Sequence, residues 1–186
     1  MNESITKDIE RVLVTEDEIK NTVKRLAGEI NAEYSKDEKN LLLLGILKGS
    51  VMVMSELMKY IEVPLTIDFM KVSSYGEGSV SYGVLNVLVD LNYDNLEDYD
   101  ILVVEDIVDT GNTLSYLLSY LKDRGAKSVK LCTLLDKPDR REKEVHIDFH
   151  GIKIENEFVV GFGLDYAEKY RNLPYIGVLK KEIYTK

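Results

Sequence analysis

The segment DILVVEDIVDTGNTLSYLLSYL, residues 100–121, contains the pattern that decides the fold. It begins with a short apolar run, which is typical of a strand buried on both faces of a parallel sheet. It ends with leucines at helical spacing, which predict a helix with one apolar face. The Thr-Gly-Asn-Thr sequence between them indicates a turn at the carboxyl end of the strand, where open α/β sheets bind their ligands.

The rest of the chain repeats this alternation of strands and helices. Thr15 and the acidic residues after it are typical of the start of a helix, which the apolar spacing extends to residue 34. Helical spacing also covers 54–61 and 114–121. Strands are expected at 41–47, 64–72, 84–90, 100–106, 128–137, 157–165 and 175–180. These elements predict an α/β fold with a central, mostly parallel sheet flanked by helices.

Two of the expected strands, 64–72 and 84–90, enclose the segment SSYGEGSVSYG at 73–83. The segment contains three glycines and four serines. Loops of this length without secondary structure of their own are usually functional or disordered. We therefore expect a hairpin whose flexible tip is a lid over a ligand site.

The composition limits the classes of function. The 186-residue chain can build one large core and shows no break in composition, so a single domain over 1–186 is expected. A net charge of -9 without a long basic run argues against a nucleic-acid partner. Cys132 is the only cysteine, which fits a reducing cytoplasm. No signal peptide or apolar run of ~18 residues is present, so neither export nor a membrane partner is expected.

The turn after the strand at 100–106 combines an anion site with carboxylates. Backbone N–H groups of Thr110–Thr113 lie at a helix N-terminus, where they can hold a phosphate. Neither a Walker A loop nor a complete G-x-G-x-x-G is present, so a monophosphate is the expected ligand. Glu105 and Asp106 can accept hydrogen bonds from a vicinal diol and bind Mg²⁺. A ribose 5-phosphate satisfies both features, and Asp109 is then left near the anomeric carbon, where it can take a proton.

The order strand, Glu-Asp, two aliphatic residues, Asp-Thr-Gly and Thr resembles the phosphoribosyl-diphosphate signature of type I phosphoribosyltransferases. Further blocks are similar to the bacterial type of the hypoxanthine-guanine phosphoribosyltransferase branch, and they occur in the same order. They are GILKGS (45–50), SSYGEG (73–78), LLDKPDRR (134–141) and FVVGFGLDYAEKYRNLPYIGVL (158–179). The resemblance covers roughly residues 8 to 182.

This resemblance implies transfer of the 5-phosphoribosyl group from phosphoribosyl diphosphate to N9 of hypoxanthine or guanine, giving IMP or GMP and pyrophosphate in purine salvage. It implies that Asp109 is the general base, that Lys137 donates to the purine 6-oxo group, and that Phe158 stacks on the base. Mg²⁺ would be held by Glu105, Asp106 and Asp165. The other implied substrate-binding residues are Lys48, Gly49, Ser74, Tyr75, Ile107, Val108, Thr110, Gly111, Asn112, Thr113, Val159, Leu164 and Arg171.

The resemblance also implies the type I phosphoribosyltransferase fold, in which a small hood formed by the chain ends accompanies the sheet and the lid hairpin. Ser74 and Tyr75 match the family's closing pair. The family often carries a non-proline cis peptide before the lysine that corresponds to Lys48. A homodimer or homotetramer is expected.

Several alternatives remain open at this level. The enzyme could act on another purine such as xanthine or adenine, or the chain could be an RNA-binding regulator on the same fold. Asp-Thr-Gly also occurs in aspartic proteases, but there in all-β surroundings. His146, Asp148 and His150 alternate with apolar residues and could share one strand face around a metal, although exposed strand residues are the better account.

Overall fold

The structure is a computed structural model and describes residues 6–35, 40–74, 85–93 and 95–185. Its larger sheet has six strands in the order β4-β3-β2-β5-β6-β7. All neighbouring strands in it are parallel except β3 and β4, which form an antiparallel hairpin. The strands are β2 (Leu41–Ile46), β3 (Leu65–Ser74), β4 (Leu85–Val89), β5 (Asp100–Val108), β6 (Ser128–Asp136) and β7 (Phe149–Lys153). The expected mostly parallel sheet is confirmed.

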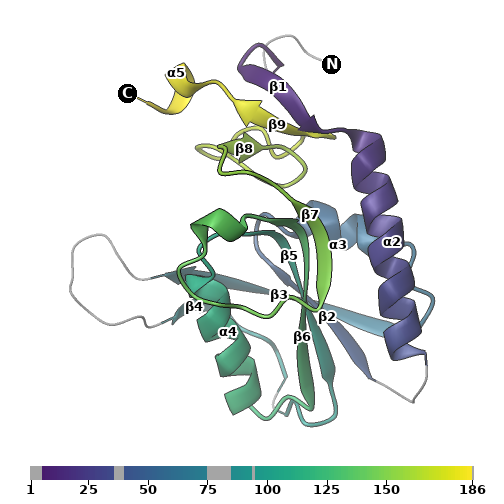
Figure 1. Cartoon of the computed structure of the whole chain (residues 1–186). Helices are drawn as coiled ribbons and strands as arrows, with labels where there is room; N and C mark the ends of the chain where they lie inside the picture. Colours follow the sequence, from purple (N-terminus) through teal and green to yellow (C-terminus); the bar gives the residue numbers. More distant parts are fainter. Residues whose placement is uncertain (1–5, 36–39, 75–84, 94, 186) are drawn as a thin grey trace.

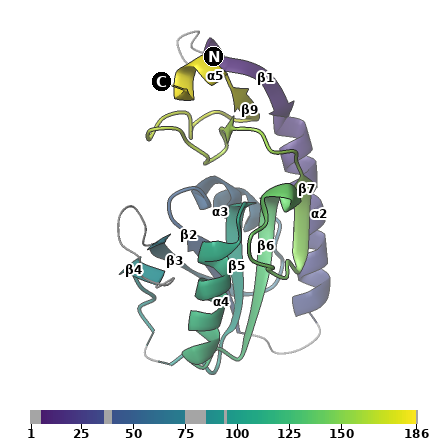
Figure 2. The same cartoon turned by 60° about the vertical axis from the view of Figure 1, so that its left-hand side comes forward.

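Helices cover both faces of this sheet, as Figures 1 and 2 show. Helices α2 (Glu16–Tyr34) and α3 (Val51–Leu57) lie on one face, and α4 (Asn112–Asp123) lies on the other. Strand β2 is buried at every residue, with Leu41 and Leu43 in the core under α2 and Leu42 and Leu44 in the core under α4. The uninterrupted apolar sequence of β2 follows from this position, because neither of its faces meets water.

The two ends of the chain build a second, smaller sheet. It contains β1 (Ile9–Val14), β8 (Val159–Val160) and β9 (Ile176–Leu179) in the antiparallel order β1-β9-β8. The short helix α5 (Lys181–Tyr184) follows β9. We call these elements, together with the loop from 161 to 175, the hood. In Figure 1 the hood lies above the end of the large sheet at which α4 begins, and it contains both β1, near the start of the chain, and α5, near its end.

The expectation that 157–165 and 175–180 complete the large sheet is wrong, because both segments pair in the hood. Only two residues of the first segment are extended as β8. The chain then passes through Gly161, Phe162 and Gly163, all with positive φ, which is incompatible with a continuing strand. The strand β1 was not predicted at all, since its polar and apolar residues lack a strong period.

Other local expectations also needed correction. The helix expected over 54–61 ends at Leu57, because the Asn31 side chain binds the Tyr60 carbonyl and the Glu62 N–H and holds that segment in a turn. Of the alternating residues His146, Asp148 and His150, only His150 lies in a strand, because β7 begins at Phe149. The expected lid tip lies outside the described residues between residues 75 and 83.

No helix in the described ranges is long and apolar enough to cross a membrane.

The junction between β1 and α2 is fixed by a capping box. The Thr15 hydroxyl accepts a hydrogen bond from the Glu18 N–H at 3.3 Å, and the Glu18 carboxylate accepts one from the Thr15 N–H at 2.8 Å. We expect Thr15→Ala to lower the free energy of unfolding by ~1 kcal/mol, because it leaves an N–H of the first helical turn without a partner. Urea unfolding measures the change, and Thr15→Ser is the matched control. Equal stability of the alanine variant and the wild type would contradict the role of the cap.

Candidate active site

The turn between β5 and α4, at residues 110–113, forms a small cradle that suits an anion, and we call it the anion turn. Gly111 has φ of 81°, and a Cβ atom at this position would lie 2.3 Å from the carbonyl oxygen of Lys143, so only glycine fits. The first N–H groups of α4 have no acceptor within the helix. A cavity of about 130 Å³ opens here. It is lined by Glu105, Ile107, Asp109, Thr110, Gly111, Thr113 and Leu114.

The two neighbouring acids of β5 face different surroundings. Glu105 lines the small cavity, and its Oε2 atom is buried without a hydrogen-bond partner. Burial, and next the negative charge of Asp106, raise the pKa of Glu105 well above its usual value. Asp106 points toward the turn after β2, where a Cβ atom on Gly49 would lie 1.7 Å from its Oδ2 atom. Burial raises the pKa of Asp106 to about 6, although the Ile107 N–H opposes the shift by donating to its carboxylate. Glu105 therefore has a carboxylate oxygen without a donor, whereas the donors to Asp106 do not fully offset the burial of its carboxylate.

A second cavity, of about 360 Å³, lies between the ends of β5 and β6 and the hood. It shares Ile107 and Asp109 with the small cavity. Its other lining residues are Lys137, Arg140, Asn156, Glu157, Phe158, Val159, Leu164 and Tyr184. The two cavities therefore meet at Asp109.

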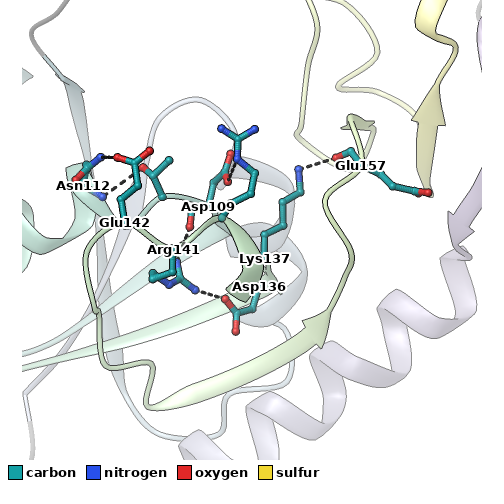
Figure 3. Close-up of polar contacts among 9 residues, drawn as sticks. Asp109, Asn112, Asp136, Lys137, Arg141, Glu142 and Glu157 are labelled. Carbon is teal, nitrogen blue, oxygen red and sulfur yellow. Dashed lines mark hydrogen bonds and ion pairs between the residues drawn. The ribbon is translucent and has the colours of Figure 1, made fainter.

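The larger cavity is lined by a buried lysine and by a carboxylate that lies beside an arginine. Lys137 is only 7% exposed, and its ammonium group donates to the Glu157 carbonyl at 2.6 Å (Figure 3). Burial lowers the pKa of Lys137, and the negative charge of Asp109 opposes that shift. The Nε atom of Arg140 lies 3.2 Å from Oδ1 of Asp109. A ligand in this cavity would thus meet a hydrogen-bond donor at one end and a proton acceptor at the other.

The segment after Lys137 contacts residues of the turn between β5 and α4. The guanidinium of Arg141 forms an ion pair with Asp136 and donates to the Asp109 carbonyl at 2.8 Å (Figure 3). Asn112 donates to the Glu142 carboxylate at 2.6 Å, so its side chain is turned away from the small cavity. Sequence reasoning assigned nothing to Arg140 and Arg141, although two adjacent arginines beside Lys137 in a chain of net charge -9 were a usable signal.

A third group of charges connects the turn after β2 to the hood. The Lys48 ammonium lies 2.8 Å from the Glu168 carboxylate, and the Arg171 guanidinium lies 2.7 Å from Asp165. The Leu47-Lys48 peptide is cis, which the sequence had left open. Gly163 lies against the same turn, because a Cβ atom on it would lie 2.0 Å from the Gly49 carbonyl oxygen.

Not every predicted residue lies in a cavity. The Val108 side chain is fully buried in the core under α4, and only its carbonyl, which accepts the Lys137 N–H at 2.9 Å, faces the site region. Asp165 lines neither of the two cavities that meet at Asp109. Ser74 is the last residue of β3, and Tyr75 lies outside the described residues.

The carboxylates suit an open metal site and not a closed one. Across the described ranges, no three or more His, Cys, Asp and Glu side chains are grouped so that they could hold a metal ion. The predicted ligands Glu105, Asp106 and Asp165 therefore form no preassembled cage. Mg²⁺ commonly takes only one or two carboxylates and completes its shell with water and substrate phosphates. The partnerless oxygen of Glu105 fits such a shared site.

Comparisons with known proteins agree with this geometry. The family model "Phosphoribosyl transferase domain" matches residues 14–167. The chain is 52% identical over 184 residues to the bifunctional protein TilS/HprT of Listeria monocytogenes; the match covers 99% of the chain but only 28% of that protein's length. It is 50% identical to the hypoxanthine-guanine phosphoribosyltransferase of Bacillus subtilis, over 95% of the chain and 97% of the relative.

Solved structures give the same assignment. A hypoxanthine phosphoribosyltransferase from Staphylococcus aureus matches with a TM-score of 0.94 and 46% identity, covering 100% of both chains. The hypoxanthine phosphoribosyltransferase of Trypanosoma cruzi matches with a TM-score of 0.89 and 38% identity, over 96% of this chain and 99% of that one. The chain therefore belongs to the phosphoribosyltransferase family, in its hypoxanthine-guanine branch.

Proposed function

We propose that the protein transfers the 5-phosphoribosyl group from phosphoribosyl diphosphate to N9 of hypoxanthine or guanine, giving IMP or GMP and pyrophosphate in purine salvage. The observation that carries this proposal is the junction of the two cavities at Asp109 and Ile107. One cavity has an anion turn and an acid, which suit a sugar phosphate, and the other has an aromatic ring and a buried lysine, which suit a flat base. The bond between sugar and base would form where they meet.

Base selection follows from the chemistry of Lys137. An ammonium group has three donors and no acceptor, so it binds a 6-oxo group but not the 6-amino group of adenine. Its contact with the Glu157 carbonyl fixes the direction of the remaining donors. Phe158 offers a ring for stacking, and the backbone of Val159 can bind the base edge.

Proton transfer is assigned to Asp109. Its carboxylate would accept the N7 proton of the purine as N9 attacks C1 of the ribose. The Arg140 guanidinium lies 3.2 Å from this carboxylate, and the nearer oxygen, Oδ1, is buried without a hydrogen-bond partner of its own. This geometry suits general base catalysis because the acceptor lies where the base and the sugar would meet.

The sugar and the leaving group would be held by the remaining predicted residues. Thr110–Thr113 would bind the 5-phosphate, and Glu105 would accept a hydrogen bond from a ribose hydroxyl. Lys48 and Arg171 would exchange their present acidic partners for pyrophosphate oxygens and so stabilise the departing charge. When bound, Mg²⁺ would be held by Glu105, Asp106 and Asp165 with substrate oxygens, and would withdraw negative charge from the pyrophosphate.

Three further properties belong to the same proposal. The chain would act as one catalytic unit, and Ser74 and Tyr75 would lie on a lid that excludes water during the reaction. It would work in the cytoplasm, to which a single buried cysteine is suited. It would form a homodimer or homotetramer, for which the exposed side chains Ile67, Leu88 and Val89 on the β3-β4 hairpin supply apolar surface.

The direct test is nucleotide formation from a panel of purines with phosphoribosyl diphosphate and Mg²⁺. We expect IMP from hypoxanthine and GMP from guanine, and no AMP from adenine, because Lys137 cannot accept a hydrogen bond. Chromatography of the nucleotides measures the outcome. Formation of AMP without IMP or GMP would refute the assignment of the base.

Removal of the proposed general base should affect chemistry more than binding. We expect Asp109→Asn to reduce kcat by ~10² to 10⁴, while the Kd for phosphoribosyl diphosphate stays within a few-fold of wild type. Asp139→Asn, an exposed acid in the next segment, is the matched control. Unchanged turnover in the Asp109 variant would exclude this residue as the base.

Replacement of the buried lysine should weaken binding of the purine without weakening binding of phosphoribosyl diphosphate. We expect Lys137→Ala to raise the KM for hypoxanthine by roughly 10- to 100-fold, the range for a lost charged hydrogen bond, with little change for phosphoribosyl diphosphate. Initial rates with each substrate varied in turn measure the difference. Lys153→Ala is the control, since it removes an exposed lysine of β7. An equal rise in both KM values would instead indicate a general structural defect and contradict the assigned role.

A further inference from the structure

A second aromatic ring, from the end of the chain, supports Phe158. The ring of Tyr184 stacks on Phe158 with centroids 4.6 Å apart and 18° between the planes. Tyr166 meets Phe158 edge to face, with centroids 5.6 Å apart. Phe158 nevertheless remains 38% exposed, and both Phe158 and Tyr184 line the larger cavity. Tyr184 thus covers one face of the ring, and the uncovered part is available to a planar ligand.

The position of Tyr184 is set by the hood. Ile183 and Tyr184 are partly buried against a small apolar cluster made of Val160, Tyr170, Leu173 and Leu179. Just before α5, the Lys180 N–H donates to the Asp8 carbonyl at 3.0 Å, which fixes the start of the helix to the N-terminal segment. The same cluster therefore packs against β8, which follows directly after Phe158, and against α5, which carries Tyr184.

We propose that Tyr184 is a positioning residue for purine binding: it holds the Phe158 ring in the plane that a stacked 6-oxopurine requires and closes the outer wall of the cavity. This inference rests on the proposed function. Aromatic rings prefer offset parallel stacking at the separation seen here, and a ring has few torsions to order. Support of this kind needs the ring of Tyr184 and not its hydroxyl group.

The test compares four full-length variants by steady-state kinetics with each substrate varied in turn. We expect Tyr184→Leu and Tyr184→Ala to raise the KM for hypoxanthine by roughly 3- to 10-fold, while the KM for phosphoribosyl diphosphate and kcat change less than 2-fold. Tyr184→Phe should restore the wild-type KM because it keeps the ring. Glu182→Ala, an exposed residue of the same helix, is the control and should behave as wild type.

The leucine variant keeps the test decisive, because it preserves apolar packing against the hood cluster even if the alanine variant unfolds. Thermal midpoints of all variants verify that they are folded. An unchanged KM for hypoxanthine in folded Tyr184→Leu would overturn the inference. A lowered KM would also overturn it, since it would mean that the ring obstructs the base. Equal rises in both KM values would indicate a structural role only. A wild-type protein that forms no nucleotide from any purine would remove the proposed function, and this inference with it.

Discussion

The buried guanidinium of Arg141 ties together the ends of β5 and β6, which carry the turn at 110–113 and Lys137. It forms an ion pair with Asp136 at the end of β6 and donates to the backbone of Asp109 after β5, so it connects the carboxyl ends of two neighbouring strands. Both side chains of the pair are nearly inaccessible, at 9% and 5% exposure. A buried charge that loses its partner is strongly destabilising, so neither member can be removed alone. Lys137 and the turn at 110–113 lie next to these two anchors, so this contact adds to the pairing of Val108 with Asp136 in holding their spacing.

The candidate site lies between the two sheets, and neither sheet alone carries all of its residues. The large sheet supplies the anion turn, the acids and Lys137 at the ends of its parallel strands, where such sheets generally bind ligands. The hood supplies Phe158 and Arg171 from the opposite side. The backbones of the two parts approach each other closely at Gly163 and Gly49. A side chain at Gly163 would not fit there, because its Cβ atom would lie 2.0 Å from the Gly49 carbonyl oxygen. Under the proposed function, the base and the pyrophosphate each contact both sheets, whereas the 5-phosphate contacts only the large one.

The sequence predicted the part of the fold whose pattern is local. Unbroken apolar runs identified β2, β5 and β6, and the strand-turn-helix at 100–121 identified the anion turn. It did not predict β1 and the hood pairing, because a two-residue strand followed by Phe162 and two glycines at positive φ has no periodic signal. The contact between Arg141 and Asp109 joins residues far apart in the chain, and no local pattern encodes it. The stack of Tyr184 on Phe158 escaped prediction for the same reason.

Carboxylates beside a phosphate turn are unfavourable unless other groups offset their negative charge. Here Glu105 has a buried oxygen without a donor, and burial raises the pKa of both Glu105 and Asp106. The Glu105 oxygen therefore needs a partner that the described side chains do not supply, such as a hydroxyl donor or a cation. Under the proposed function, the ribose hydroxyls and Mg²⁺ supply it, while the phosphate binds the backbone N–H groups of the next turn. The acids would then favour a sugar phosphate over a bare phosphate, because a bare phosphate brings no hydroxyl groups to them.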